Sequence, residues 1–66
     1  MKRNQLIKHL IGNGCVFDRE GRNHTIYYNP VINKSTSVPR HNEIKDKICN
    51  EICKQLGVPK IKVKHF

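Results

Sequence analysis

Apolar residues recur at helical spacing near both ends of the chain, and shorter apolar runs lie between them. In the first segment they repeat at i, i+3 and i+4, which places them on one helix face. The members are Leu6, Ile7, Leu10 and Ile11. Asn4 is a suitable N-cap, and the run Gly12-Asn13-Gly14 supplies a stop. The pattern predicts a short amphipathic helix over residues 4–12.

Three segments typical of β-strands follow, each bounded by turn-forming residues. The predicted strands cover residues 15–19, 25–28 and 35–38. The turn Glu20-Gly21-Arg22-Asn23 separates the first two strands, and a loop over residues 30–34 leads to the third, which is the weakest. The sequence therefore predicts three short consecutive strands.

A second apolar series at i+4 spacing indicates another helix. Its members are Ile44, Ile48, Ile52 and Leu56, with Cys49 and Cys53 beside them. We expect this helix to begin at Glu43, with His41 or Asn42 as its cap. Gly57 and Pro59 then end it.

The predicted element order is α-β-β-β-α in one domain over residues 1–66, which is an α+β fold. A three-stranded antiparallel sheet cannot bury an apolar face alone, and two amphipathic helices on one face would cover it. The opposite face of the sheet then stays open for function. Residues 58–66 form a basic tail whose alternating pattern fits either an edge strand or a basic arm.

The net charge of the chain indicates which class of partner it binds. The 66 residues carry 13 Lys and Arg against 5 Asp and Glu, a net charge of +8. Such an excess on a small domain favours binding to a polyanion such as RNA over binding to a membrane surface. No segment is long and apolar enough to span a bilayer.

The three cysteines are an odd number with no disulfide pattern, which indicates a reducing cytoplasm. A chain this short leaves little room for a deep cofactor pocket, and we expect no cofactor.

Two motifs carry a resemblance to a known family. They are Asn23-His24-Thr25-Ile26-Tyr27, preceded by Asn13-Gly14 and Arg19, and Val38-Pro39-Arg40-His41-Asn42-Glu43-Ile44. Over residues 4–57 the chain resembles the HicA family of toxin–antitoxin mRNA interferases. The resemblance implies a fold like that of double-stranded-RNA-binding domains (dsRBD-like), RNA cleavage with His24 as the catalytic residue, and a HicB-like antitoxin protein that covers the active site.

Two positions depart from the family pattern. Arg22 stands where a related subgroup has a second glycine, so it would be strained if that position required a positive φ. Thr25 stands where an acidic residue often follows the histidine, which removes a carboxylate that could orient the imidazole.

The chemistry expected of His24 is general base catalysis. Imidazole, with an unperturbed pKa of about 6.5, can take a proton from a ribose 2′-hydroxyl near neutral pH without a metal. DNA lacks that hydroxyl, so the chemistry would select RNA. The alternatives are an RNA-binding module without catalysis and a domain that binds only a partner protein.

Several side chains are candidates for RNA contacts. The guanidinium groups of Arg19, Arg22 and Arg40 can hold phosphate oxygens. Tyr28 shares a strand face with His24, so if His24 faces outward Tyr28 can stack on a base while Tyr27 packs under the helices. The alternative is that both tyrosines are ordinary β-sheet aromatics. Lys45 and Lys47, near the start of the second helix, are further candidates or part of a solvated face. We expect no metal site, because Cys49 and Cys53 lack two further ligands at zinc spacing and are better explained as buried thiols.

Overall fold

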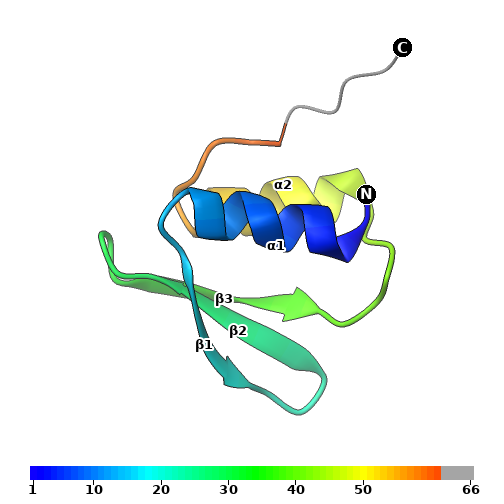
Figure 1. Cartoon of the computed structure of the whole chain (residues 1–66), viewed down its shortest axis with the longest axis horizontal. Coiled ribbons are helices and arrows are strands. Elements are labelled where there is room, and N and C mark those ends of the chain that lie inside the picture. The colour runs from blue at the N-terminus through cyan, green and yellow to red at the C-terminus, as the bar shows by residue number, and fades with distance from the viewer. Residues whose placement is uncertain (62–66) are drawn as a thin grey trace.

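The computed structural model describes residues 1–61, and it confirms the predicted α-β-β-β-α order. The elements are α1 (Arg3–Gly12), β1 (Val16–Glu20), β2 (His24–Asn29), β3 (Lys34–Pro39) and α2 (Asp46–Gln55). The two helices lie side by side over one face of the three-stranded sheet (Figure 1). Residues 58–61 follow α2 without helix or strand, and the rest of the predicted basic tail lies outside the described residues.

β2 is the central strand and pairs antiparallel with both neighbours. Burial along β2 alternates, with Thr25, Tyr27 and Asn29 buried. Because successive strand residues point to opposite faces, these three lie toward the helices. His24, Ile26 and Tyr28 therefore lie together, as the sequence predicts, on the face that no helix covers.

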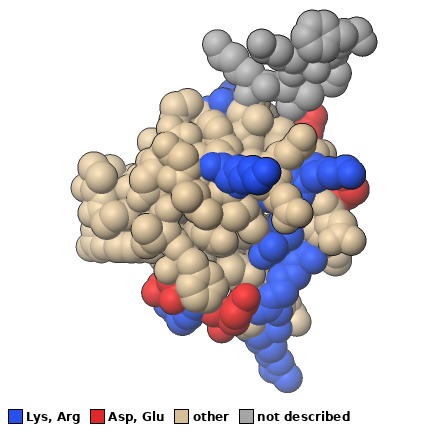
Figure 2. Space-filling view, viewed as in Figure 1, with Lys and Arg blue, Asp and Glu red and all other residues tan. Residues whose placement is uncertain are grey.

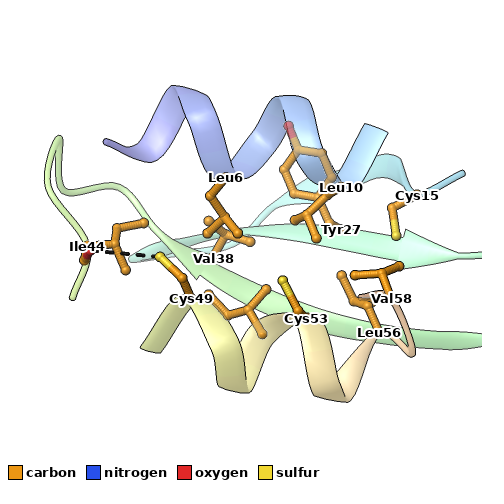
Figure 3. Close-up of a cluster of buried hydrophobic side chains, with 11 residues drawn as sticks. Leu6, Leu10, Cys15, Tyr27, Val38, Ile44, Cys49, Cys53, Leu56 and Val58 are labelled. Atoms are coloured by element: carbon orange, nitrogen blue, oxygen red, sulfur yellow. Dashed lines mark hydrogen bonds between the residues drawn. The ribbon is translucent and has the colours of Figure 1, made fainter. Parts of the chain in front are cut away.

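The core lies between the helices and the sheet (Figure 3). Its fully buried members come from both helices and the sheet, and they include Leu6 and Leu10 from α1, Val38 from β3, and Cys53 and Leu56 from α2 and its end. Truncating one such leucine to alanine costs about 2–5 kcal/mol in proteins generally. In a chain this small, that loss is a large share of the total stability.

The predicted stripe on α2 is wrong at one position. Ile48 is 41 % exposed, whereas the exposed fractions of Cys49 and Cys53 are 1 % and 0 %. The Cys49 thiol lies 3.8 Å from the Ile44 carbonyl oxygen, to which it donates. The other members of the series, Ile44, Ile52 and Leu56, are buried as predicted, and the buried thiols confirm their predicted role.

The residues predicted to cap the two helices do not cap them. Pairing between the segments that precede the two helices explains both errors. Lys2 pairs with Glu43 in an isolated antiparallel bridge. The Arg3 N–H donates to the Asn42 carbonyl at 2.9 Å, and the Ile44 N–H donates to the Met1 carbonyl at 2.8 Å. These extended segments replace side-chain caps, so α1 begins before Asn4 and α2 begins at Asp46 rather than at Glu43.

Asn29 ties the end of β2 to the end of α2. Its Nδ2 donates to the Leu56 carbonyl at 2.7 Å, and its Oδ1 accepts from the Val31 N–H at 3.0 Å.

The turn between β2 and β3 contains Asn33 with a positive φ of 54°. Among the helices described, none is long and apolar enough to cross a membrane.

Candidate functional site

His24 lies at the first position of β2, on the open face of the sheet and beside the β1–β2 turn. It is exposed and pairs with Pro39 of β3. Ile26 and Tyr28 follow it along the same face, and Arg19 of β1 pairs with Ile26. A single-stranded polymer laid on this face would therefore meet an imidazole at one end and an aromatic ring four residues further along.

The turn before His24 is held closed by its own backbone. The Gly21 N–H donates to the His24 carbonyl at 2.7 Å. A Cβ on Gly21 would lie 3.0 Å from that carbonyl oxygen, so the close approach explains why glycine stands there. Arg22 is not strained, because positive φ values in residues 1–61 occur only at Gly14, Asn33 and Gly57.

Arg40 follows β3 and binds the same turn through its guanidinium group. Nε and Nη2 donate to Glu20 Oε1 at 3.2 Å and 3.0 Å. Nη1 donates to the Arg22 carbonyl at 3.1 Å. The two N–H groups of Nη2 are shared among Glu20 Oε1, the His24 carbonyl at 3.0 Å and the Gly21 carbonyl. One side chain thus joins β1, the turn and the first residue of β2.

The Glu20 carboxylate continues this network toward α1. The Thr25 hydroxyl donates to Glu20 Oε1 at 2.8 Å and accepts a hydrogen bond from Arg3 Nη2 at 2.9 Å. Arg3 Nε also donates to the Pro39 carbonyl at 2.8 Å. The hydrogen bonds from Thr25 and then Arg40 lower the pKa of Glu20 below its ordinary value, so the carboxylate stays charged at neutral pH.

Glu20 and Arg3 were missed by the sequence analysis. Thr25 has no carboxylate of its own, but it is bonded to one from the neighbouring strand. The hairpin register pairs Glu20 with Thr25, and this pairing is the signal that could have found the first of these residues.

The other predicted RNA contacts on the sheet are accessible. Arg19 is exposed, and its Nη1 donates to the neighbouring Asp18 carboxylate at 2.7 Å in a surface ion pair of small energetic value. The β-bulge between Phe17 and Arg19 places this arginine opposite Ile26. The Tyr28 hydroxyl donates to Asn33 Oδ1 at 2.7 Å, which fixes the orientation of its ring on the open face.

Lys45 and Lys47 lie at the start of α2, on the helix side of the sheet, whereas His24 lies on the open face. Lys45 is the exposed residue before α2. Lys47 lines a surface groove of about 640 Å³ together with Lys54 and Lys60. Arg22 and Tyr28 therefore lie on the turn and the strand that carry His24, and the Arg40 side chain lies against that turn. The two predicted lysines do not lie there.

Basic side chains are unevenly spread over the surface. In Figure 2 the Lys and Arg side chains gather toward the side with the β1–β2 turn and the start of α1, while the β2–β3 turn at the opposite end shows none on this face. Lys2, Arg3 and Arg40 line a hollow of about 360 Å³ at the basic end. On this face, the end of the sheet that carries His24 thus has more basic side chains than the β2–β3 end, with acidic side chains among them.

The remaining histidines and the cysteines do not join this site. His41 is exposed between β3 and the segment paired with residues 1–3. His9 is half-buried on α1 with its Nε2 2.6 Å from the Pro59 carbonyl oxygen. Burial raises the pKa of the Cys49 and Cys53 thiols, which keeps them protonated and poor metal ligands at neutral pH. Within residues 1–61, no group of three or more His, Cys, Asp or Glu side chains could hold a metal ion.

Comparison with known proteins identifies the family. Searches of curated proteins and of solved structures gave no match. The model of the family described as the HicA toxin of bacterial toxin–antitoxin matches residues 3–58. The matched segment includes every helix and strand described above and both motifs that carry the resemblance. The chain belongs to the HicA toxin family of bacterial toxin–antitoxin systems.

Proposed function

We propose that this toxin is an mRNA interferase, a metal-independent endoribonuclease with His24 as its general base. The observation that carries the proposal is the exposed imidazole at the start of β2, on the open face and the basic end of a HicA-family fold. An endoribonuclease of this kind acts in the cytoplasm, where its RNA substrate is found, and the three free, buried cysteines fit that compartment.

The proposed reaction uses the ribose next to the scissile phosphate as the nucleophile. The His24 imidazole takes the proton of the 2′-hydroxyl, and the 2′-oxygen attacks phosphorus. The bond from phosphorus to the 5′-oxygen breaks, and the leaving oxygen takes a proton from water. The products are a 2′,3′-cyclic phosphate and a free 5′-hydroxyl. General base catalysis of this type contributes about 10²–10⁴-fold, so one histidine makes a modest nuclease.

We infer that RNA lies along the open face from the β1–β2 turn toward Tyr28. Arg19 and Arg22 then contact phosphates, and the Tyr28 ring stacks on a base. Lys45 and Lys47 stay predictions for contacts to RNA that extends past the sheet. The sequence also predicts a phosphate contact for Arg40, but each of its three nitrogens already donates to an acceptor within the protein.

A HicB-like antitoxin is the proposed protein partner. Family membership implies a toxin–antitoxin pair. An acidic or apolar partner surface over the open face would cover His24 and Tyr28 together and thereby exclude RNA.

The test is an RNA cleavage assay with EDTA present, using the purified chain and two histidine variants. The parent chain and His41→Ala are expected to cleave, because His41 lies outside the proposed machinery. His24→Ala is expected to lose about 10²–10⁴-fold in rate. Circular dichroism checks that all three proteins are folded. Loss of cleavage with EDTA, or full activity of His24→Ala, would contradict the proposal.

The second candidate is an RNA-binding module without catalysis, which the net charge of +8 and the open sheet face also favour. In that case neither the parent nor His24→Ala cleaves, and both bind RNA equally well. Their affinity would fall steeply as salt rises, because phosphate contacts release counterions. A domain that binds only a protein partner would show no such salt-dependent affinity.

A further inference from the structure

Arg40 makes more hydrogen bonds than any other side chain in the described part of the chain, and all of them go to protein atoms around His24. Its acceptors are the Glu20 carboxylate and the carbonyls of the residues that form and follow the β1–β2 turn. The His24 carbonyl receives two of the bonds in this region, one from Arg40 and one from the Gly21 N–H. The backbone of the proposed base is therefore fixed by a residue from another strand.

The sheet register explains how this contact arises. Pro39 pairs with His24, so the next residue after β3 lies beside the turn that precedes β2. Arginine carries five N–H donors in a planar fork, and the contact uses all three nitrogens. Lysine has a single nitrogen and cannot span acceptors on both sides of a turn.

We propose that Arg40 is a positioning residue for His24, which holds the β1–β2 turn through Glu20 and the turn carbonyls, and that it does not bind phosphate. This inference rests on the proposed function for its effect on cleavage. Glu20 takes part because its carboxylate orients the guanidinium from one side, while Thr25 and Arg3 orient the carboxylate from the other.

The rival role makes opposite predictions. If Arg40 bound an RNA phosphate, Arg40→Lys would keep the positive charge and with it the salt slope of log K, although the forked contact would be lost. Removing the charge with Arg40→Gln would then weaken RNA binding and lower the salt slope of log K by about 0.7, the share of one phosphate on a single strand. Under the positioning role, both variants bind RNA with nearly the parent affinity and salt slope.

The experiment measures binding and cleavage separately. Affinity is titrated against salt with a 2′-O-methylated oligonucleotide, which has no free 2′-hydroxyl and cannot be cut. The cleavage rate is measured with unmodified RNA at saturation. Arg40→Lys is expected to lower kcat about 10- to 100-fold with KM nearly unchanged, because a misplacement of about 1 Å costs a rate of this size. Arg22→Gln serves as the matched control, with weaker binding and a smaller salt slope.

Glu20→Gln supplies a second, independent variant. It removes a negative charge, so simple electrostatics would raise RNA affinity and leave the rate at saturation unchanged. The positioning role instead predicts a fall in kcat similar to that of Arg40→Lys, and the double variant should be no worse than either single one. Additive losses in the double variant would overturn the proposal, as would a fall in affinity and salt slope in Arg40→Gln with kcat unchanged.

A readout that does not need activity separates this inference from the proposed function. The Gly21 amide donates to the His24 carbonyl, so its hydrogen exchange reports whether the turn is closed. Arg40→Lys is expected to reduce the protection of this amide while core amides such as that of Tyr27 keep theirs. If the parent chain does not cleave RNA, the proposed function fails, and unchanged protection of Gly21 would overturn the positioning role by itself.

Discussion

Replacing Asn29 with alanine tests the link between the end of β2 and the end of α2. The Leu56 carbonyl lies just past the last residue of α2, where helix carbonyls have no amide partner within the helix. The Asn29 side chain supplies that partner, and Leu56 itself is fully buried. No water replaces the bond easily at such a position, so the variant leaves a buried acceptor without a donor.

The magnitude follows from the two bonds that Asn29 makes. An unpaired buried carbonyl costs about 1–3 kcal/mol. The bond to the Val31 N–H adds a net loss of about 0.5–1.5 kcal/mol, because that residue is 85 % exposed and its amide can turn to water. The expected loss is about 1.5–4.5 kcal/mol, against a total stability of about 3–10 kcal/mol for a chain of this length. The melting temperature should fall by about 6–36 °C.

Thermal and urea unfolding followed by circular dichroism measure this loss. Asn29→Asp is the informative companion, because the introduced carboxylate keeps the acceptor for Val31 but faces the Leu56 carbonyl with a negative charge. Its stability deficit should shrink as pH falls and the carboxyl gains a proton to donate. A loss below about 0.5 kcal/mol in Asn29→Ala, within the range of ordinary surface substitutions, would refute the argument.

Three further outcomes follow from single sites. Gly57→Ala should destabilise more than Gly14→Ala in urea unfolding: both glycines have positive φ, but only at Gly57 would the new Cβ meet another atom, the Ile32 side chain at 2.7 Å. The folded-state pKa of Glu20 is lowered, so the stability it contributes is present above the ordinary carboxyl value of 4.5 and is lost as pH falls through the lower folded pKa. Melts across this range should therefore show a smaller acid-induced loss for Glu20→Gln. The Cys49 thiol, buried with a raised pKa, should react with a thiol reagent only on unfolding, and rapid labelling of the native protein would contradict the burial.

The order of elements could be predicted because it follows from short-range patterns. The spacing of Leu6 and Leu10 indicates a helix face, and the period of two in a strand places His24 and Tyr28 on one face and Thr25 and Tyr27 on the other. Which face the helices cover could not be predicted from these residues, because residues 26–28 are all bulky and apolar or aromatic and show no clean alternation. The structure shows it through the burial of Thr25 and Tyr27.

The helix starts and the role of Arg40 depend on contacts between distant segments. Asn42 looks like a cap from its local sequence, but its carbonyl is paired with Arg3, 39 positions earlier in the chain. Arg40 looks like an exposed phosphate ligand, yet the register of β2 with β3 places it beside Glu20. Local propensity cannot report such pairings, because they exist only once the sheet has formed.

Tyr27 and Tyr28 provide a matched pair that tests which face of the sheet meets RNA. Tyr27 is buried, with Phe17 edge-on to it at 6.2 Å, whereas Tyr28 lies on the face of His24. Tyr28→Leu should weaken binding of the 2′-O-methylated oligonucleotide about 5- to 150-fold, since stacking on one base is worth about 1–3 kcal/mol, and should change stability little. Tyr28→Phe keeps the ring and should keep most of the affinity. Tyr27→Leu should instead lower the melting temperature and leave the affinity of the folded protein unchanged. If Tyr28→Leu binds as the parent does, RNA does not lie along the open face, and its proposed path from His24 to Tyr28 is wrong.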